Sequence, residues 1–166
     1  HLSIRRQRQM CIRDSLIECV SKGGNLLLNV GPTGRGEFDH RALERLAGIG
    51  EWMKRHGRSI YGCTAAPEEF KCPADCRYTW NPDSRRLYLH VFSWPYRHLH
   101  LDGMADTIEY AQLLNDASEV RMLKRVPEEE YGAMKASRKE SLLTLELPVK
   151  KPFVTVPVIE LLVKRR

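Results

Sequence analysis

The sequence lacks any apolar run long enough to cross a membrane as a helix. Its apolar stretches at residues 26–28 and 154–163 are cut by Asn29, Pro157 and Glu160, whereas a spanning helix needs about 18 or more apolar residues in a row. Arginines interrupt the start of the chain and no apolar core follows them, so a secretory leader is not indicated. We therefore expect no spanning helix, no leader and no membrane partner.

The middle of the chain lacks an excess of basic charge. The formal net charge is +6, but residues 1–15 hold four arginines against one aspartate, and residues 164–166 are all basic. The excess therefore lies at the two ends, and residues 16–163 are neutral with mixed acids and bases. Phosphate binding requires clustered cations, so we expect no nucleic acid partner.

Two close pairs of metal-binding cysteines are also missing. Five cysteines are present, an odd number, and only Cys72 and Cys76 stand close together. A structural zinc site takes four ligands, often as two close pairs, and no fitting histidine or second pair lies near Cys63. We expect no metal, no cofactor and unpaired thiols, with one bridge among Cys63, Cys72 and Cys76 left open.

Residues 1–15 lack the periodicity of a helix or a strand. The string RRQRQMCIRDS resembles a translated sequencing adaptor, so we interpret residues 1–15 as an artefactual or disordered start and exclude them from the fold argument. Protein-like patterning begins near Leu16. Residues 14–22 predict a short amphipathic helix, which Gly23 and Gly24 end.

The next segment alternates a buried strand with a helix. Residues 25–30 read NLLLNV, and a run that is apolar on both faces is typical of a strand buried in a parallel sheet. After a loop over 31–36, Asp39 is placed to cap a helix over 40–56, which Gly57 ends. The apolar stripe of that helix comprises Leu43, Leu46, Ala47, Gly50 and Met53.

After Tyr61 the pattern changes to short runs with a period of two, separated by turn residues. The predicted strands are residues 77–80, 86–94, 98–101, 107–114, 120–123, 142–147 and 154–163. Strands at this spacing indicate a β-sandwich, and we expect a solvated loop over 127–140. In residues 86–94 both faces carry large side chains, with Leu87, Leu89 and Val91 on one face and Tyr88, His90, Phe92 and Trp94 on the other, so this strand is expected in the middle of a sheet.

Two segments resemble a known family. LIECVSKGGNLLLNVGPTGRGEF, running into ALERLAGIGEWMKRHGRSIYG, resembles the end of the catalytic barrel of α-L-fucosidases, retaining glycoside hydrolases that remove terminal fucose. RYTWNPDSRRLYLHVFSWP followed by HLHLDG is similar to the opening of the β-sandwich after that barrel. The resemblance covers roughly residues 16 to 125. The tail from about residue 126 to 166 is similar only in consisting of strands that would close the sandwich.

This resemblance implies an α/β remnant, the last βα unit of a TIM barrel, followed by an all-β antiparallel sandwich. It assigns residues 16–62 to the end of a (β/α)8 barrel, 63–74 to a linker and 75–166 to the C-terminal sandwich. The parent protein would act on fucosylated glycans and would be secreted, periplasmic or lysosomal, while its oligomeric state stays open.

Retaining glycosidases use two carboxyl groups about 5 Å apart, and in this family they stand on earlier barrel strands that are absent here. We therefore expect no catalytic residue in this chain and no activity from it alone. The available acids are interpreted as solvated or helix-capping groups: Glu18, Glu37, Asp39, Glu44 and Glu51.

A few residues remain as binding candidates. Asn29 stands at the C-terminal end of the expected barrel strand, where active sites of that fold are built, so it either lines the substrate cavity or only bonds the next turn. Trp94 and Tyr96 are the aromatic residues best placed to face a sugar. Trp52 is expected in the core between barrel and sandwich. His90, His98 and His100 are expected to be solvated or hydrogen-bonded rather than metal ligands.

The alternative function is a non-catalytic β-sandwich module that binds carbohydrate or protein. The NLLLNV run argues against it, because an isolated small domain has no neighbours to cover both faces of that strand. We expect residues 75–163 to fold as a compact sandwich and residues 16–62 to be poorly stable without the barrel, with order lost chiefly in residues 1–36. The predicted sandwich core comprises Leu87, Leu89, Val91, Leu99, Leu101, Ile108, Leu143, Leu145, Ile159 and Leu161.

Overall fold

The computed structural model describes residues 2–124 and 141–165, with side chains from Cys11 onward. Two helices, α1 (Leu2–Ser21) and α2 (His40–His56), precede a short 3₁₀ turn, η1 (Gly57–Ser59). Seven strands follow: β1 (Cys76–Asn81), β2 (Arg86–Val91), β3 (His98–Leu101), β4 (Ile108–Leu113), β5 (Arg121–Leu123), β6 (Leu143–Glu146) and β7 (Val158–Val163). The loop predicted over 127–140 lies outside the described residues. No helix in the described part combines the length and apolarity that a membrane crossing requires.

The strands form two antiparallel sheets, as the sequence predicts for a sandwich. One sheet has the order β1-β2-β7-β4 and the other β3-β6-β5. All seven predicted strands are present, but β7 begins at Val158 instead of residue 154. Val156 has a φ of 47°, and Pro157 has no N–H to donate. The hydrogen-bonded pairing of β7 therefore starts only after these two residues.

The two central strands of the four-stranded sheet, β2 and β7, are buried on both faces. On β2, Leu87, Leu89 and Val91 point into the sandwich core, while Tyr88 belongs to a second cluster formed with the helices. Strand β7 alternates in the same way, because Val158 pairs with His90 in register and joins the helix side. Every residue of the predicted sandwich core lies in the core between the two sheets, with Leu99 partly buried at its margin.

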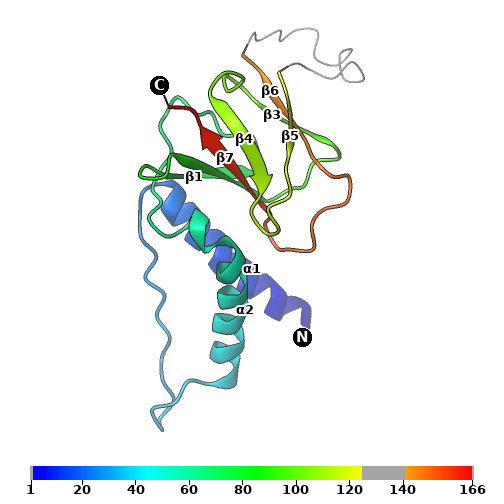
Figure 1. Cartoon of the computed structure of the whole chain (residues 1–166). Helices are drawn as coiled ribbons and strands as arrows, with labels where there is room; N and C mark the ends of the chain where they lie inside the picture. Colours follow the sequence, from blue (N-terminus) through cyan, green and yellow to red (C-terminus); the bar gives the residue numbers. More distant parts are fainter. Residues whose placement is uncertain (1, 125–140, 166) are drawn as a thin grey trace.

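Both helices pack on the outer face of this sheet, away from β3, β6 and β5 (Figure 1). The second cluster joins Ile17 and Val20 of α1, Trp52 of α2 and Tyr88 of β2. Helix α2 matches its predicted bounds, and Asp39 caps it by accepting hydrogen bonds from the amides of Arg41 at 2.7 Å and Ala42 at 3.0 Å.

Helix α1 starts at Leu2, so the expectation of an irregular start over residues 1–15 was wrong for its backbone. Arginine, glutamine, methionine and leucine favour a helix even without an apolar stripe. The predicted end is confirmed: Gly23 has a φ of 76° and its amide donates to the carbonyl of Val20. An adaptor origin for residues 1–15 stays a prediction.

The predicted strand at residues 25–30 does not form. These residues are extended and outside any sheet, and Leu27 and Leu28 are 86% and 41% exposed. A parallel strand needs hydrogen-bonded neighbours and covered faces, and none is present in the described part of the chain. Figure 1 shows this segment as an open trace running away from the sandwich.

Gly57 ends α2 as predicted, because it is the C-cap residue and its amide donates to the carbonyl of Met53, but its backbone is not left-handed. Its φ of −56° is right-handed, and the chain continues directly into the η1 turn. A Cβ at this position would lie 3.2 Å from the ring of Tyr61. A larger residue here would crowd the Tyr61 ring, so close packing favours glycine at this position and a left-handed conformation does not.

Candidate functional site

The junction between α2 and the sandwich is centred on Trp52. Its side chain is 6% exposed, and its indole N–H donates a hydrogen bond of 2.8 Å to the carbonyl of Thr155. The ring of His56 stacks on it with a centroid distance of 4.8 Å and an angle of 14°. The prediction that Trp52 is core rather than a sugar platform is confirmed.

His90 lies buried beneath this junction. The hydroxyl of Thr79 donates its single proton to the carbonyl of Ser59 at 2.6 Å, so it accepts from Nε2–H of His90 at 3.0 Å. Burial and the nearby His56 lower the pKa of His90 to about 3, against a smaller opposing effect of the Ser59 backbone. His90 is thus a neutral, positioned core histidine.

Glu160 places a buried carboxylate on the helix-facing side of β7. One oxygen accepts from Arg86 at 2.8 Å, and the other accepts from Arg58 at 3.4 Å and from the side-chain amide of Gln112. The Glu160 side chain is 1% exposed. Because Arg58 belongs to the turn after α2, this carboxylate ties the helical part to the sandwich.

The carboxylates of the helices are held in ion pairs or caps. Glu18 pairs with Lys22 at 2.6 Å and Arg77 at 2.5 Å, and Glu51 pairs with Lys54. These contacts lower the pKa of both acids, and backbone amides, that of Ala42 foremost, lower the pKa of Asp39. A general acid needs a raised pKa, so the interpretation of these acids as structural agrees with their surroundings.

Asp14 behaves differently. Burial raises its pKa, although Arg13 opposes the shift, and Asp14 shares a hollow of about 370 Å³ with Glu18 and Arg77. Sequence reasoning missed it because residues 1–15 were set aside. Both oxygens of Glu18 are occupied by cations, so this hollow does not supply the free carboxylate that a retaining glycosidase needs as its nucleophile.

The predicted binding residues are not brought together. Asn29 is exposed in the unpaired extended stretch. The indole of Trp94 donates to the carbonyl of Pro148 at 3.0 Å and packs against the sandwich core. Tyr96 is 79% exposed, so its ring is the more accessible of the two. A role for Asn29, Trp94 or Tyr96 at a substrate stays a prediction.

The cysteine and histidine side chains form no metal centre. All five cysteines are free thiols, and no group of three or more metal-ligating side chains occurs among the described residues. His100 bonds Thr144 at 2.9 Å. Burial raises the pKa of the Cys76 thiol to about 12, which makes it a poor nucleophile at neutral pH.

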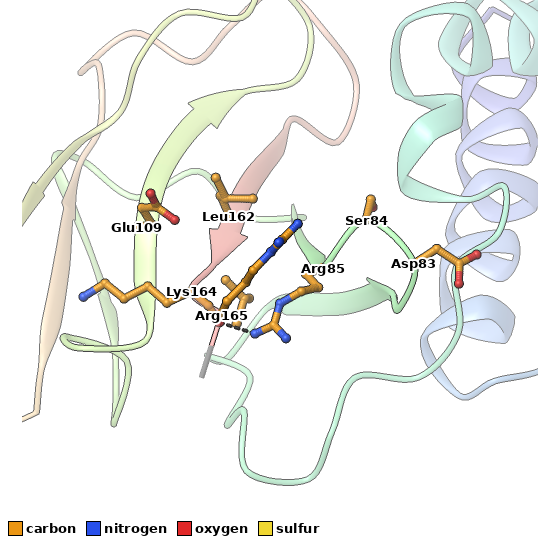
Figure 2. A pocket seen from close by; sticks show the side chains of 8 residues that line it. Asp83, Ser84, Arg85, Glu109, Leu162, Lys164 and Arg165 are labelled. Carbon is orange, nitrogen blue, oxygen red and sulfur yellow. Dashed lines mark hydrogen bonds between the residues drawn. The ribbon is translucent and has the colours of Figure 1, made fainter.

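A hollow of about 640 Å³ lies where the β1–β2 turn meets the end of β7. Figure 2 shows Arg85 and Arg165 in its middle, with Asp83 toward one end and Glu109 toward the other. Arg85 has a φ of 54° and donates to the backbone carbonyl of Lys164. Sequence reasoning missed this site, although the basic run at residues 164–166 was noted.

The comparisons with known proteins agree on one group of enzymes. The family model for α-L-fucosidase matches residues 5–58. Human plasma α-L-fucosidase is 38% identical over 81 residues, which cover 48% of this chain and 17% of that enzyme. The matched segment therefore spans about a sixth of the length of the curated relatives.

Solved structures give the same result over nearly the whole chain. α-L-Fucosidase isoenzyme 1 from Paenibacillus thiaminolyticus matches with a TM-score of 0.79 and 32% identity, covering 95% of this chain and 35% of that one. A GH29 α-L-fucosidase from Bacteroides thetaiotaomicron, trapped as a covalent intermediate, matches with a TM-score of 0.75 and 26% identity over 95% and 32% of the two chains.

The class that these matches define is the glycoside hydrolases. Within that class the resemblance to α-L-fucosidases is confirmed, and the chain is similar to a part of such enzymes. The sheet-rich fold agrees with that of the matched enzymes.

Proposed function

We propose that this chain is the C-terminal part of a retaining α-L-fucosidase. In this proposal residues 16–62 end the catalytic barrel, 63–74 link the two parts and 75–166 form the C-terminal sandwich. The parent enzyme removes terminal α-L-fucose from glycoconjugates, and fucosylated glycans are its partners. The observation that carries the proposal is the joint match of sequence and fold to α-L-fucosidases across the helices and the sandwich.

The unpaired stretch at 25–30 supports the barrel assignment. Leu27 and Leu28 are exposed although their run is apolar on both faces. An exposed, unpaired apolar segment favours association with other strands. In a barrel, neighbouring parallel strands would pair with both of its edges, while the outer helices and the barrel interior would cover its two faces. A stand-alone binding module offers no such cover, so the stretch favours the enzyme over the module.

Retention is supported by the chemistry of a structural relative. The Bacteroides enzyme was trapped as a covalent intermediate, and a covalent glycosyl-enzyme is the hallmark of retaining hydrolysis. The parent of this chain would use the same two-carboxylate chemistry, with both groups supplied by barrel strands outside these residues. The chain alone is therefore proposed to be inactive.

The sandwich is proposed to brace the end of the barrel. Trp52 and Arg58 come from the helical part, and their partners Thr155 and Glu160 come from the segment leading into and through β7. Fixing α2 on a rigid sheet would hold the last helix of the proposed barrel in place. We propose that the Asn29 amide lines the substrate cavity of the parent enzyme, at the end of a strand where such folds build their sites.

The direct test uses the purified 166-residue chain and an aryl α-L-fucoside. We expect hydrolysis at the rate of buffer alone, because transition-state stabilisation needs a positioned nucleophile and acid. Turnover above buffer that Glu18→Gln or Asp14→Asn abolishes would show that these residues contain a catalytic pair. Glu44→Gln, on an exposed part of α2, serves as the matched control.

A further inference from the structure

The segment before β1 lies along the free edge of that strand. β1 is an outer strand of its sheet, which has the order β1-β2-β7-β4. Thr64 exchanges two backbone hydrogen bonds with Trp80 of β1, at 2.8 and 2.9 Å. The ring of Phe70 meets that of Trp80 edge to face, with a centroid distance of 6.1 Å. Because an open edge can pair with a foreign strand, residues 63–74 protect the sandwich by covering β1.

Two thiols stand where this segment turns into β1. Cys72 and Cys76 are separated by three residues, and residues 74–75 between them form a turn in which Asp75 has a φ of 54°. The carbonyl of Asp75 accepts a hydrogen bond of 3.0 Å from the amide of Phe92, which fixes the turn beside the end of β2. A turn reverses the chain within about four residues, so it returns Cys72 toward the start of β1.

The surroundings of the two thiols overlap at Tyr78. Cys76 lies with Tyr78 in the sandwich core and is 2% exposed, whereas Cys72 is exposed. Burial raises the pKa of Cys72 to about 11, while Arg77 and the backbone amide of Tyr78 oppose the rise. Burial is also the main cause of the raised pKa of Cys76 and of Tyr78, and the charge of Cys72 adds to both. Charges act on a pKa mainly over about 4–6 Å, so the two thiols are neighbours.

The third thiol of this region lies on the other face of the sheet. Cys63 packs against the cluster that the helices form, and its thiol donates to the carbonyl of Arg58 at 3.4 Å. Cys76 belongs to the sandwich core on the opposite face. A bridge between Cys63 and Cys76 would have to pass through the sheet. Among the bridges that the sequence leaves open, the structure therefore favours Cys72 with Cys76.

We propose that Cys72 and Cys76 form a disulfide bridge when the chain meets a low-molecular-weight disulfide such as oxidised glutathione. The exposed Cys72 loses its proton and attacks one sulfur of the glutathione disulfide, which gives a mixed disulfide and releases one glutathione thiolate. The Cys76 thiolate then attacks the Cys72 sulfur, closes the protein disulfide and releases the second glutathione thiolate. Two protein thiols are thus oxidised, and one glutathione disulfide is reduced to two thiols, which take up the two protons.

The bridge would pin the covering segment, residues 63–74, to the start of the edge strand β1. A closed loop also restricts the unfolded chain, so the bridge should stabilise the fold. Neither effect depends on the fucosidase proposal, because both concern the sandwich alone.

The test is incubation of the full 166-residue chain with oxidised glutathione, followed by denaturation, alkylation and tryptic mass mapping. A pH of about 8.5 increases the thiolate fraction. Lys71 and Arg77 flank the pair, so one tryptic peptide, CPADCR, carries both cysteines, while Cys11, Cys19 and Cys63 fall in three separate peptides. We expect CPADCR to escape alkylation and to be lighter by two hydrogen atoms than its reduced form. Alkylation of both its cysteines, or glutathione retained on Cys72, would overturn the proposal.

Two serine variants assign the pairing. Cys63→Ser is the matched control and should leave the bridge intact, whereas Cys72→Ser should abolish it and leave Cys76 open to alkylation after unfolding. The urea midpoint of the unsubstituted chain should be higher after oxidation than after reduction, and that of Cys72→Ser should not change. Loss of the bridge in Cys63→Ser would overturn the pairing, and equal midpoints of the oxidised and reduced chain would overturn its stabilising role.

Discussion

The indole N–H of Trp52 on α2 donates a 2.8 Å hydrogen bond to the backbone carbonyl of Thr155, just before β7. These residues lie 103 positions apart in the chain, and their bond fastens the helical part to the sheet. The same ring carries the stacked His56 and packs in the cluster with Tyr88. The junction is therefore a single packed unit and not two parts in loose contact.

Two substitutions of Trp52 should destabilise this junction by different amounts. Trp52→Phe keeps a ring but leaves the Thr155 carbonyl unpaired, and we expect a loss of about 1–2 kcal/mol in the free energy of unfolding. Trp52→Ala also empties the site and should cost about 3–5 kcal/mol. Urea unfolding followed by far-ultraviolet circular dichroism measures the free energy of unfolding of both variants, because this signal reports the backbone and not the tryptophan. Tyr96→Ala, at an exposed ring, is the control, and an equal loss there would refute the assignment.

Glu160 should stabilise the fold through Arg86 more than through Arg58. Glu160→Gln removes the charge from a buried group with three donors, and we expect a cost of about 1.5–3 kcal/mol. Arg58 is 59% exposed, so Arg58→Gln should cost less than about 1 kcal/mol. A double-mutant cycle of Glu160 with each arginine checks this order. Larger coupling to Arg58 than to Arg86 would contradict it.

His90 should make the protein less stable in acid. Its pKa is about 3 in the fold and about 6.5 when unfolded, so the unfolded chain binds more protons between these values. Stability is therefore complete above about pH 6.5 and falls toward pH 3, with a slope approaching 1.4 kcal/mol per pH unit. Burial also lowers the pKa of His56, which adds to the loss.

The variant His90→Gln isolates this effect, because glutamine keeps an N–H donor for Thr79 but does not titrate. Free energies of unfolding of both proteins from pH 7 to pH 4 are to be compared. The difference between them should shrink as the pH falls. A constant difference would show that His90 does not resist protonation.

Hydrogen exchange should separate the two parts of the chain. Amides of β2 sit between paired strands and should exchange slowly, whereas residues 25–30 are outside any sheet and should exchange at rates close to those of an unfolded chain. Mass spectrometry of peptic peptides reads both segments in one experiment. Comparable protection in the two would mean that the NLLLNV segment has found partners, and the barrel assignment would fail.

The sequence predicted correctly those elements that depend only on residues within their own segment. The bounds of α2 follow from its helical period and from the Asp39 side chain, both contained within the segment itself. The predicted apolar stripe is not the buried face, because the structure buries Trp52 and His56 and leaves Leu43 52% exposed. The inward set on β2 follows from alternation, since a pleated strand sends successive residues to opposite faces. The seven strands were found for the same reason.

The failures arise where the outcome depends on distant residues. NLLLNV has the composition of a buried strand, but a strand exists only with neighbours to pair with, and the described chain provides none. The Arg85 hollow is formed by a turn and a strand end that the β2–β7 pairing brings together. No pattern in the turn or in the strand end indicates that the two lie side by side in the fold.

The proposed origin in an α-L-fucosidase is tested most directly by α-L-fucoside hydrolysis with a longer protein, made by extending the reading frame upstream of these residues. We expect the extension to contain βα units, the longer protein to hydrolyse an aryl α-L-fucoside with retention, and the 166-residue chain not to hydrolyse it. An extension without βα units, or a longer protein that binds fucosylated glycans but never hydrolyses them, would contradict it and favour the binding module.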